Sequence, residues 1–172
     1  MLDGIISEVR EWSKRVLEPP REDMQDFPVC PYAAGAWEAN AADVVLVDDL
    51  RGVLQEIPSF IESKSAVKIL VKVEPDEWAM DTFLEDVRRL NRRWAKKNVY
   101  CMGLHPWDEN TFLATASERD EELDLHDEYV FLLLFRLDEI NIASKAIDSD
   151  GYYKQWRPEL YYEILARRES NK

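Results

Sequence analysis

The chain contains few cysteines and glycines and has no long apolar run. Two cysteines among 172 residues cannot form a disulfide framework, and we expect both thiols to be reduced. The longest apolar run, residues 129–135, is far shorter than the roughly 20 residues that span a bilayer. The five glycines are too scattered to form a glycine-rich phosphate loop. These absences argue against a membrane-spanning protein, a disulfide scaffold and the common nucleotide-binding motifs.

Histidine is equally scarce, which limits the metal sites that the chain can build. Two histidines exclude a three-histidine site, and neither Cys-x-x-Cys nor His-Glu-x-x-His occurs. The side chains of suitable type are Cys30, Cys101, His105, Asp108 and Glu109. Because their spacing fits no metal motif, we expect no metal site, and the sequence identifies no cofactor.

Acidic residues outnumber basic ones, and the formal net charge is −13. Such a chain repels nucleic acid and anionic membranes, so we expect neither as a partner. The acidic surface favours solubility and also suits docking to a basic protein. One basic cluster, within residues 88–97, stands apart. It is either a solvated end of a helix or a site for an anionic ligand or partner.

The remaining composition is that of an ordinary folded protein, with 46% hydrophobic and 11% aromatic residues. No internal repeat or long linker divides the chain, so residues 1–172 are predicted to form a single globular domain. The first ten residues lack the basic start and apolar core of a signal peptide, which predicts a cytoplasmic location. The oligomeric state stays open.

Apolar periodicity and proline positions predict alternating helices and strands. The predicted helices cover 2–17, 50 to Pro58, a segment after Pro75, 138–147, and Pro158 to about 168. The predicted strands are 43–47, 66–73 and 98–104. Residues 21–42 are predicted to be a loop with a helical turn at 33–40. Residues 129–136 fit either a strand or a buried helix. Residues 117–128, which include His126, are predicted to be a solvated acidic loop.

Alternation along two of these strands assigns side chains to faces of a sheet. In the strand at 66–73, Lys68 and Lys72 share a face that we expect to be partly wet. In the strand at 98–104, Cys101 shares one face with Gly103 and, just beyond the strand, His105. The element order predicts an α+β fold, ferredoxin-like or a related small mixed sheet, with helices packed on it and added N- and C-terminal helices. A small thioredoxin-like sheet is the alternative.

Two proline-flanked motifs place reactive side chains where regular structure has to stop. Cys30 lies in Phe-Pro-Val-Cys-Pro-Tyr, and His105 lies in Gly-Leu-His-Pro-Trp. A thiol can act as a nucleophile, and an imidazole as a base that lowers the pKa of that thiol. We expect Tyr32 and Trp107, which follow the two prolines, at the mouth of a pocket. Three further aromatics suit its C-terminal side or the packing of the last helices: Tyr152, Tyr153 and Trp156.

Five short elements, in preserved order across residues 8–150, carry a family resemblance. They are Trp12, Cys30-Pro31-Tyr32-Ala33, Thr82-Phe83-Leu84, Leu104-His105-Pro106 and Leu134-Phe135-Arg136. In these elements the chain resembles the DUF1415 family of small bacterial proteins, whose function is uncharacterised. It departs from that family at three places. Tyr32 stands where the family has phenylalanine, Leu104 stands where the family has an aromatic residue, and the Pro-Tyr-Pro that the family has before the arginine is missing before Arg136. The resemblance implies that Cys30, His105 and Arg136 converge, but it implies no activity.

These features allow two classes of function. As an enzyme, the protein would act on a small anionic metabolite by thiol or acid–base chemistry. Cys30 would be the nucleophile or acid and His105 the base, while Arg136 would hold the anion by its planar fork. As a noncatalytic accessory or protein-binding module, it would use its acidic surface. Cys30 would then pack as a small apolar group, and His105 would bond to nearby carbonyls.

Overall fold

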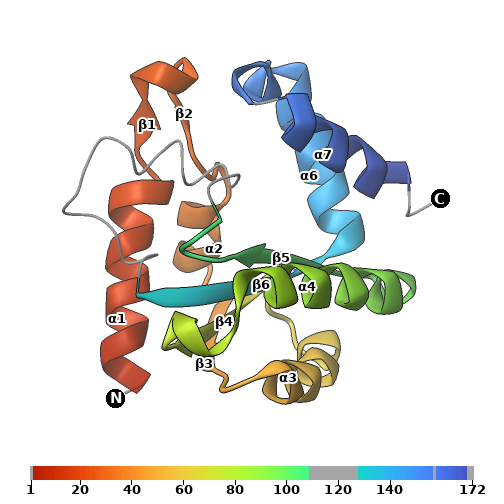
Figure 1. Ribbon diagram of the computed structural model, residues 1–172. Helices are drawn as coiled ribbons and strands as arrows, with labels where there is room; N and C mark the ends of the chain where they lie inside the picture. Colours follow the sequence, from red (N-terminus) through yellow and green to blue (C-terminus); the bar gives the residue numbers. More distant parts are fainter. Residues whose placement is uncertain (1, 109–127, 157, 170–172) are drawn as a thin grey trace.

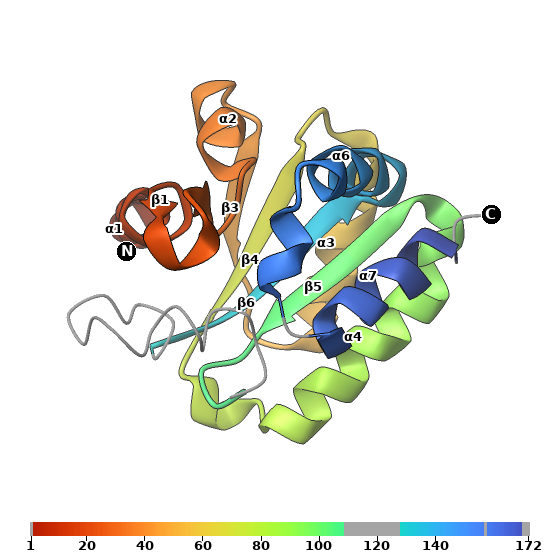
Figure 2. The same cartoon turned by 90° about the horizontal axis from the view of Figure 1, so that it is seen from above.

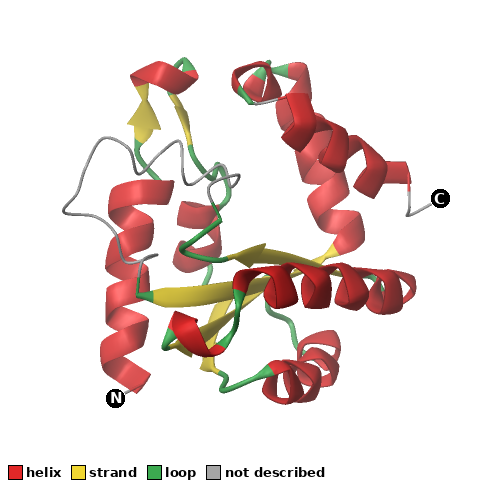
Figure 3. Cartoon of the chain, in the orientation of Figure 1, coloured by secondary structure: helices red, strands yellow, loops and turns green. Residues whose placement is uncertain are grey.

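The computed structural model describes residues 2–108, 128–156 and 158–169. The helices are α1 (Leu2–Trp12), α2 (Ala33–Glu38), α3 (Leu50–Glu62), α4 (Met80–Trp94), α6 (Leu137–Ser149) and α7 (Pro158–Glu169). The strands are β1 (Pro20–Arg21), β2 (Phe27–Pro28), β3 (Ala42–Leu46), β4 (Val67–Val73), β5 (Val99–Leu104) and β6 (Tyr129–Arg136). The short helical turns are η1 (Ser13–Leu17), η2 (Glu22–Met24), η3 (Pro75–Glu77), η4 (Ala95–Lys97) and η6 (Tyr152–Gln155). Figure 3 separates these elements by type.

A mixed four-stranded sheet with the order β3-β4-β6-β5 forms the centre of the fold. β3 and β4 are parallel, whereas β6 runs antiparallel to both of its neighbours. This confirms the predicted α+β class. The sheet is the related mixed type, because its elements run β-α-β-α-β-β and a ferredoxin-like sheet runs β-α-β-β-α-β. Residues 129–136, which the sequence left open, form a strand that pairs on both sides.

Helices cover the two faces of this sheet unequally (Figure 1). α3 and α4 pack side by side on one face, over a core that includes Phe60, Phe83 and Leu132. On the other face α1 and α2 cover one part of the sheet, and α6 and α7 rise over another part. Trp12 and Phe131 belong to the core beneath α1. Among the described residues no helix combines the length and apolar character that crossing a membrane requires.

The predicted end of α3 at Pro58 is wrong, because the helix continues to Glu62. A proline inside a helix removes one hydrogen bond and crowds the preceding turn. Here Ile57 and Phe60, on either side of Pro58, are fully buried against the sheet. Burying two large side chains stabilises the helical path by more than the proline costs.

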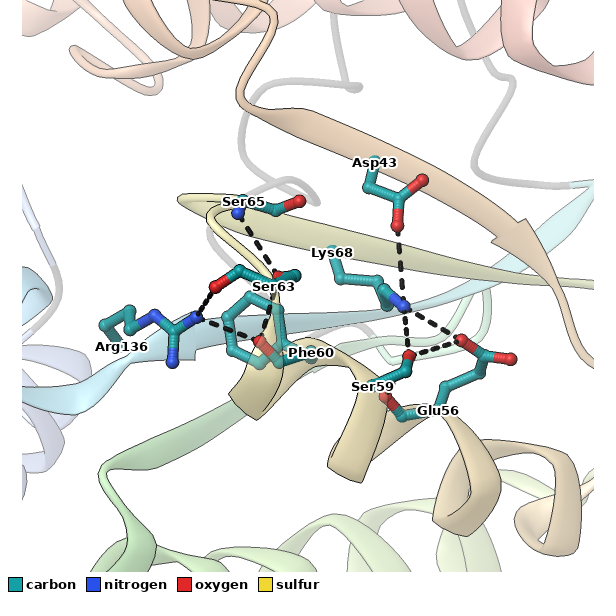
Figure 4. Close-up of polar contacts among 8 residues, drawn as sticks. All are labelled: Asp43, Glu56, Ser59, Phe60, Ser63, Ser65, Lys68 and Arg136. Atoms are coloured by element: carbon teal, nitrogen blue, oxygen red, sulfur yellow. Dashed lines mark hydrogen bonds and ion pairs between the residues drawn. The ribbon is translucent and has the colours of Figure 1, made fainter.

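The prediction that the lysine face of β4 is partly wet is also wrong. Lys68 is 4% exposed and Lys72 is 5% exposed, because α3 and α4 cover this face. The Lys68 ammonium donates to Glu56 Oε2 at 2.9 Å and to Ser59 Oγ at 2.6 Å (Figure 4). It also pairs with Asp43 Oδ2 at 3.4 Å. The buried charge is therefore satisfied by the helix that buries it and by β3.

A side chain of α4 blocks the outer edge of β5. Asn91 Nδ2 donates to the carbonyl of Cys101 at 2.9 Å, and Cys101 N donates to Asn91 Oδ1 at 2.7 Å. The amide thus supplies the two hydrogen bonds that another strand would make at Cys101. The predicted face of Cys101 is confirmed, since this residue lies in the core on the α3–α4 side.

Gly103 lets α4 approach β5 closely. A Cβ at this position would lie 2.7 Å from the Phe83 ring and 2.8 Å from Val87 Cγ2, and the ring is fully buried. We expect Gly103→Ala to lower the free energy of unfolding by about 1–3 kcal/mol through overpacking.

Gly4→Ala in α1 is the matched control, since a Cβ there meets nothing within 4 Å. It should leave stability unchanged or raise it by up to about 1 kcal/mol. Urea unfolding of both variants measures the difference. Equal stability of the two variants would contradict the close contact between α4 and β5.

Candidate functional site

The open face of the sheet carries an apolar groove between its two groups of helices. Its volume is about 320 Å³. Figure 2, which looks onto this face, shows α1 and α2 on the β3 side and α6 and α7 on the β5 side. The floor is formed by strand residues of alternating position, chiefly Val67, Ile69, Met102, Leu104, Phe131, Leu133 and Phe135. A groove of this shape and lining is typical of a binding site for a small molecule.

Aromatic side chains stiffen both walls of the groove. On the N-terminal wall Trp12 stacks on Phe131 with ring centroids 5.4 Å apart, and Trp37 Nε1 donates to Ser13 Oγ at 3.0 Å. On the C-terminal wall, the apolar side of α6 adjoins three aromatic side chains that pack against one another: Tyr152, Tyr153 and Trp156. These three residues line the groove, so the C-terminal side that the sequence suggested for them is where they lie.

Hydrogen bonds join the two walls to each other. The Tyr32 hydroxyl donates to the carbonyl of Ala143 in α6 at 2.8 Å. The Tyr152 hydroxyl donates to the carbonyl of Val29. The Phe27 ring also packs edge-on against Tyr152, with centroids 5.5 Å apart. Residues 27–32 therefore fasten the N-terminal wall to the C-terminal wall, although Tyr32 itself is 44% exposed.

Cys30 lies in the groove wall, just before α2 begins. Its N–H donates to the carbonyl of Leu17 at 2.9 Å, which holds the motif against η1. Burial raises the pKa of the thiol above its ordinary value. Backbone N–H groups of Tyr32 and Ala33, which favour the thiolate, offset this only in part. Cys30 therefore presents a neutral thiol at neutral pH.

His105 lies in the core on the α4 side of the sheet and is 1% exposed. Its ring packs against the rings of Phe83 and Trp107 at 5.5 and 5.1 Å. The Trp107 N–H donates to Nδ1 at 3.3 Å, so Nε2 carries the proton and donates to the carbonyl of Trp78 at 2.9 Å. Both ring nitrogens are thus engaged in fixing the turn after β5.

Arg136 directs its guanidinium away from the groove, to the last turn of α3 (Figure 4). It donates to the carbonyl oxygens of Phe60 at 2.9 Å, Ser63 at 2.8 Å and Ile61 at 3.3 Å. The guanidinium also lies over the Phe60 ring at 4.7 Å. Carbonyls at a helix C-terminus have no partner within the helix, so Arg136 caps α3. Arg136 is also among the residues that line the groove.

The convergence of Cys30, His105 and Arg136 that the resemblance implies is therefore absent. Cys30 and Tyr32 line the groove, whereas His105 and Trp107 lie at the turn after β5, on the α4 side. A signal for this separation was present in the sequence. Strand parity assigned His105 to the same face as Cys101, and α4 covers that face.

Sequence reasoning missed the side of α6 that lines the groove. Ile140, Ala143 and Ile147 recur at spacings of three and four positions, which is the pattern of one helix side. The sequence predicts this helix over 138–147 but assigns no role to that side of it. Nothing in the spacing tells whether another element or open space faces the helix.

Metal ligands do not gather in the described part of the chain. Within residues 2–108, 128–156 and 158–169, no group of three or more His, Cys, Asp or Glu side chains is placed to hold an ion. Glu109, His126 and most of the acidic run at 117–128 lie outside the described residues.

The pH dependence of thiol alkylation tests this description of Cys30. We expect its rate of reaction with iodoacetamide to keep rising above pH 9.0, the ordinary pKa, because burial raises the pKa. Burial also raises the pKa of Cys101 to about 12, so Cys101 should stay unmodified in the folded protein. His105→Gln should leave the Cys30 profile unchanged. Peptide mass spectrometry measures both sites, and a midpoint below pH 9.0 or a shift in His105→Gln would contradict this account.

Removal of the Arg136 cap should destabilise the fold. Arg136→Met removes the guanidinium from three carbonyls at the end of α3, of which that of Phe60 keeps Ser63 as a donor, and we expect a loss of about 1–3 kcal/mol in the free energy of unfolding. Arg51→Met, at an exposed position of α3, is the control and should change it by less than about 0.5 kcal/mol. Guanidinium unfolding measures both variants. If the two variants unfold at the same denaturant concentration, the guanidinium does not cap α3.

Comparisons with known proteins add no relative. No protein-family model, curated protein or solved structure matches the chain. The resemblance to the DUF1415 family therefore stays a prediction, and the geometry of the groove is the basis for the function that follows.

Proposed function

We propose that the protein binds a small, mainly apolar molecule in the groove on the open face of its sheet. The observation that carries this proposal is a cavity of about 320 Å³ with a lining almost wholly of aliphatic and aromatic side chains. Pockets for small molecules generally combine this volume and lining with a few polar groups that orient the ligand. Here the Cys30 thiol lines the groove and can take that role, whereas the Ser144 hydroxyl is already engaged with Asn141 and Arg168.

An apolar ligand agrees better with the groove than the anionic metabolite expected from the sequence. Transfer of a charged group into apolar surroundings is costly unless an opposite charge meets it. The cation expected to meet it, Arg136, donates instead to three carbonyls at the end of α3. A ligand held by dispersion and by loss of hydration needs no such partner.

Binding without catalysis also agrees better with the candidate catalytic groups. A thiol nucleophile needs a lowered pKa or a neighbouring base. Burial raises the pKa of Cys30, and both His105 nitrogens bond to backbone groups on the α4 side. These contacts support the noncatalytic class, with the groove in place of the acidic surface as the binding site.

Fluorescence titration with the neutral apolar dye N-phenyl-1-naphthylamine tests the proposal. Ala143→Phe projects a ring into the groove, and we expect it to weaken dye binding by about tenfold or more, equivalent to about 1.4 kcal/mol. Ala146→Phe, at an exposed position of the same helix, is the matched control. It should bind the dye as the wild type does.

A second variant covers the case in which Ala143→Phe perturbs the bond from Tyr32. Leu133→Gln places an amide on the floor of the groove and should weaken binding without filling it. Circular dichroism confirms that each variant is folded. If the wild type does not bind the dye, or if Ala146→Phe weakens binding as much as Ala143→Phe, the groove is not the binding site.

A further inference from the structure

The outer side of α4 carries a concentrated positive charge that the groove does not use. We call it the basic stripe, formed by Arg88, Arg89, Arg92, Arg93, Lys96 and Lys97. All six side chains are exposed. The stripe runs along α4 and η4, which pack on the sheet face opposite the groove (Figure 1).

The geometry of α4 holds these charges in two parallel rows. Along a helix, positions four apart lie above one another, so one row begins at Arg88 and continues with Arg92. The other row begins at Arg89 and continues with Arg93. At 1.5 Å per residue the stripe is about 13 Å long. Phe83 and Leu90 are buried on the opposite side of the helix, so the stripe cannot turn away from solvent.

Within residues 2–108, 128–156 and 158–169 the stripe is poorly neutralised. Among the residues that the structure describes, Glu85 is the one carboxylate in ion-pair range. Three guanidinium groups share it, with Arg88 at 3.8 Å, Arg89 at 3.3 Å and Arg92 at 3.0 Å. Arg93 instead lies over the Trp94 ring, at 5.3 Å. Six cations beside one carboxylate leave a local excess of positive charge.

We propose that the basic stripe docks a short acidic segment of a partner protein. Four of the six cations are arginines, whose planar forks match the geometry of carboxylates. The rest of this acidic chain is more negative than its net charge of −13, since the stripe holds six of its cations. A long polyanion such as nucleic acid would extend past the stripe and be repelled, whereas a short acidic segment would not.

The stripe and the groove lie on opposite faces of the sheet, so this proposal does not depend on the proposed function. A partner on α4 would leave the groove open. The buried side of α4 fixes the helix backbone from which the six exposed side chains extend.

The test is a nuclear magnetic resonance titration of the whole protein with an oligoglutamate of about six residues, enough in extended form to span the stripe. We expect amide shifts confined to residues 85–97 that weaken as salt is raised. Oligoglutamine of equal length should cause none. The charge-reversal double variant R88E/R92E should bind oligoglutamate at least about tenfold more weakly, a change of about 1.4 kcal/mol.

The double variant K14E/K145E is the matched control, because it changes net charge equally at exposed positions outside the stripe. It should keep most of the binding. Three results would overturn the proposal. Equal losses of oligoglutamate affinity in the two double variants would indicate an effect of net charge, and tighter binding of an oligothymidylate of the same length would indicate a phosphate site. Self-association of the wild type at low salt that R88E/R92E abolishes would show that the stripe binds a second copy of the chain.

Discussion

The fold depends on how two cations fasten α3 to the sheet. Lys68, near the start of β4, donates to carboxylate and hydroxyl groups on α3, and Arg136, at the end of β6, donates to carbonyls of the last turn of that helix. Both charges are directed to the same face. On the opposite face the strand residues that form the floor of the groove are apolar, and polar groups of the lining such as Cys30 and Arg167 come from its walls.

Local pattern predicts most of the elements, because each depends on side chains close together in the chain. The strand at 66–73, the strand at 98–104 and the helices on either side of Gly151 follow from periodicity and turn residues. The predictions are wrong where packing against an element distant in the sequence determines the structure. Pro58 stays inside a helix because the sheet buries its neighbours, and Lys68 is dry because α3 lies over it.

The candidate site also could not be predicted from local sequence pattern alone. The motifs around Cys30 and His105 correctly mark ends of regular structure, yet a motif does not say which side of a sheet its residue will face. Arg136 lies far from Cys30 and His105 in the sequence, and only the folded structure shows that its guanidinium donates to carbonyls at the end of α3. Residue types can suggest a reaction, but only the topology of the sheet shows whether the residues lie together in one site.

The bonds from Tyr32 to Ala143 and from Tyr152 to Val29 join residues 111 and 123 positions apart. Closing a loop of that length lowers the conformational entropy of the chain, and this cost precedes the favourable contacts that the closed loop makes. Contacts between residues far apart in sequence generally slow folding. The sheet can form before the N-terminal and C-terminal walls of the groove come together, but the groove cannot. We therefore expect the cavity to assemble after the sheet during folding.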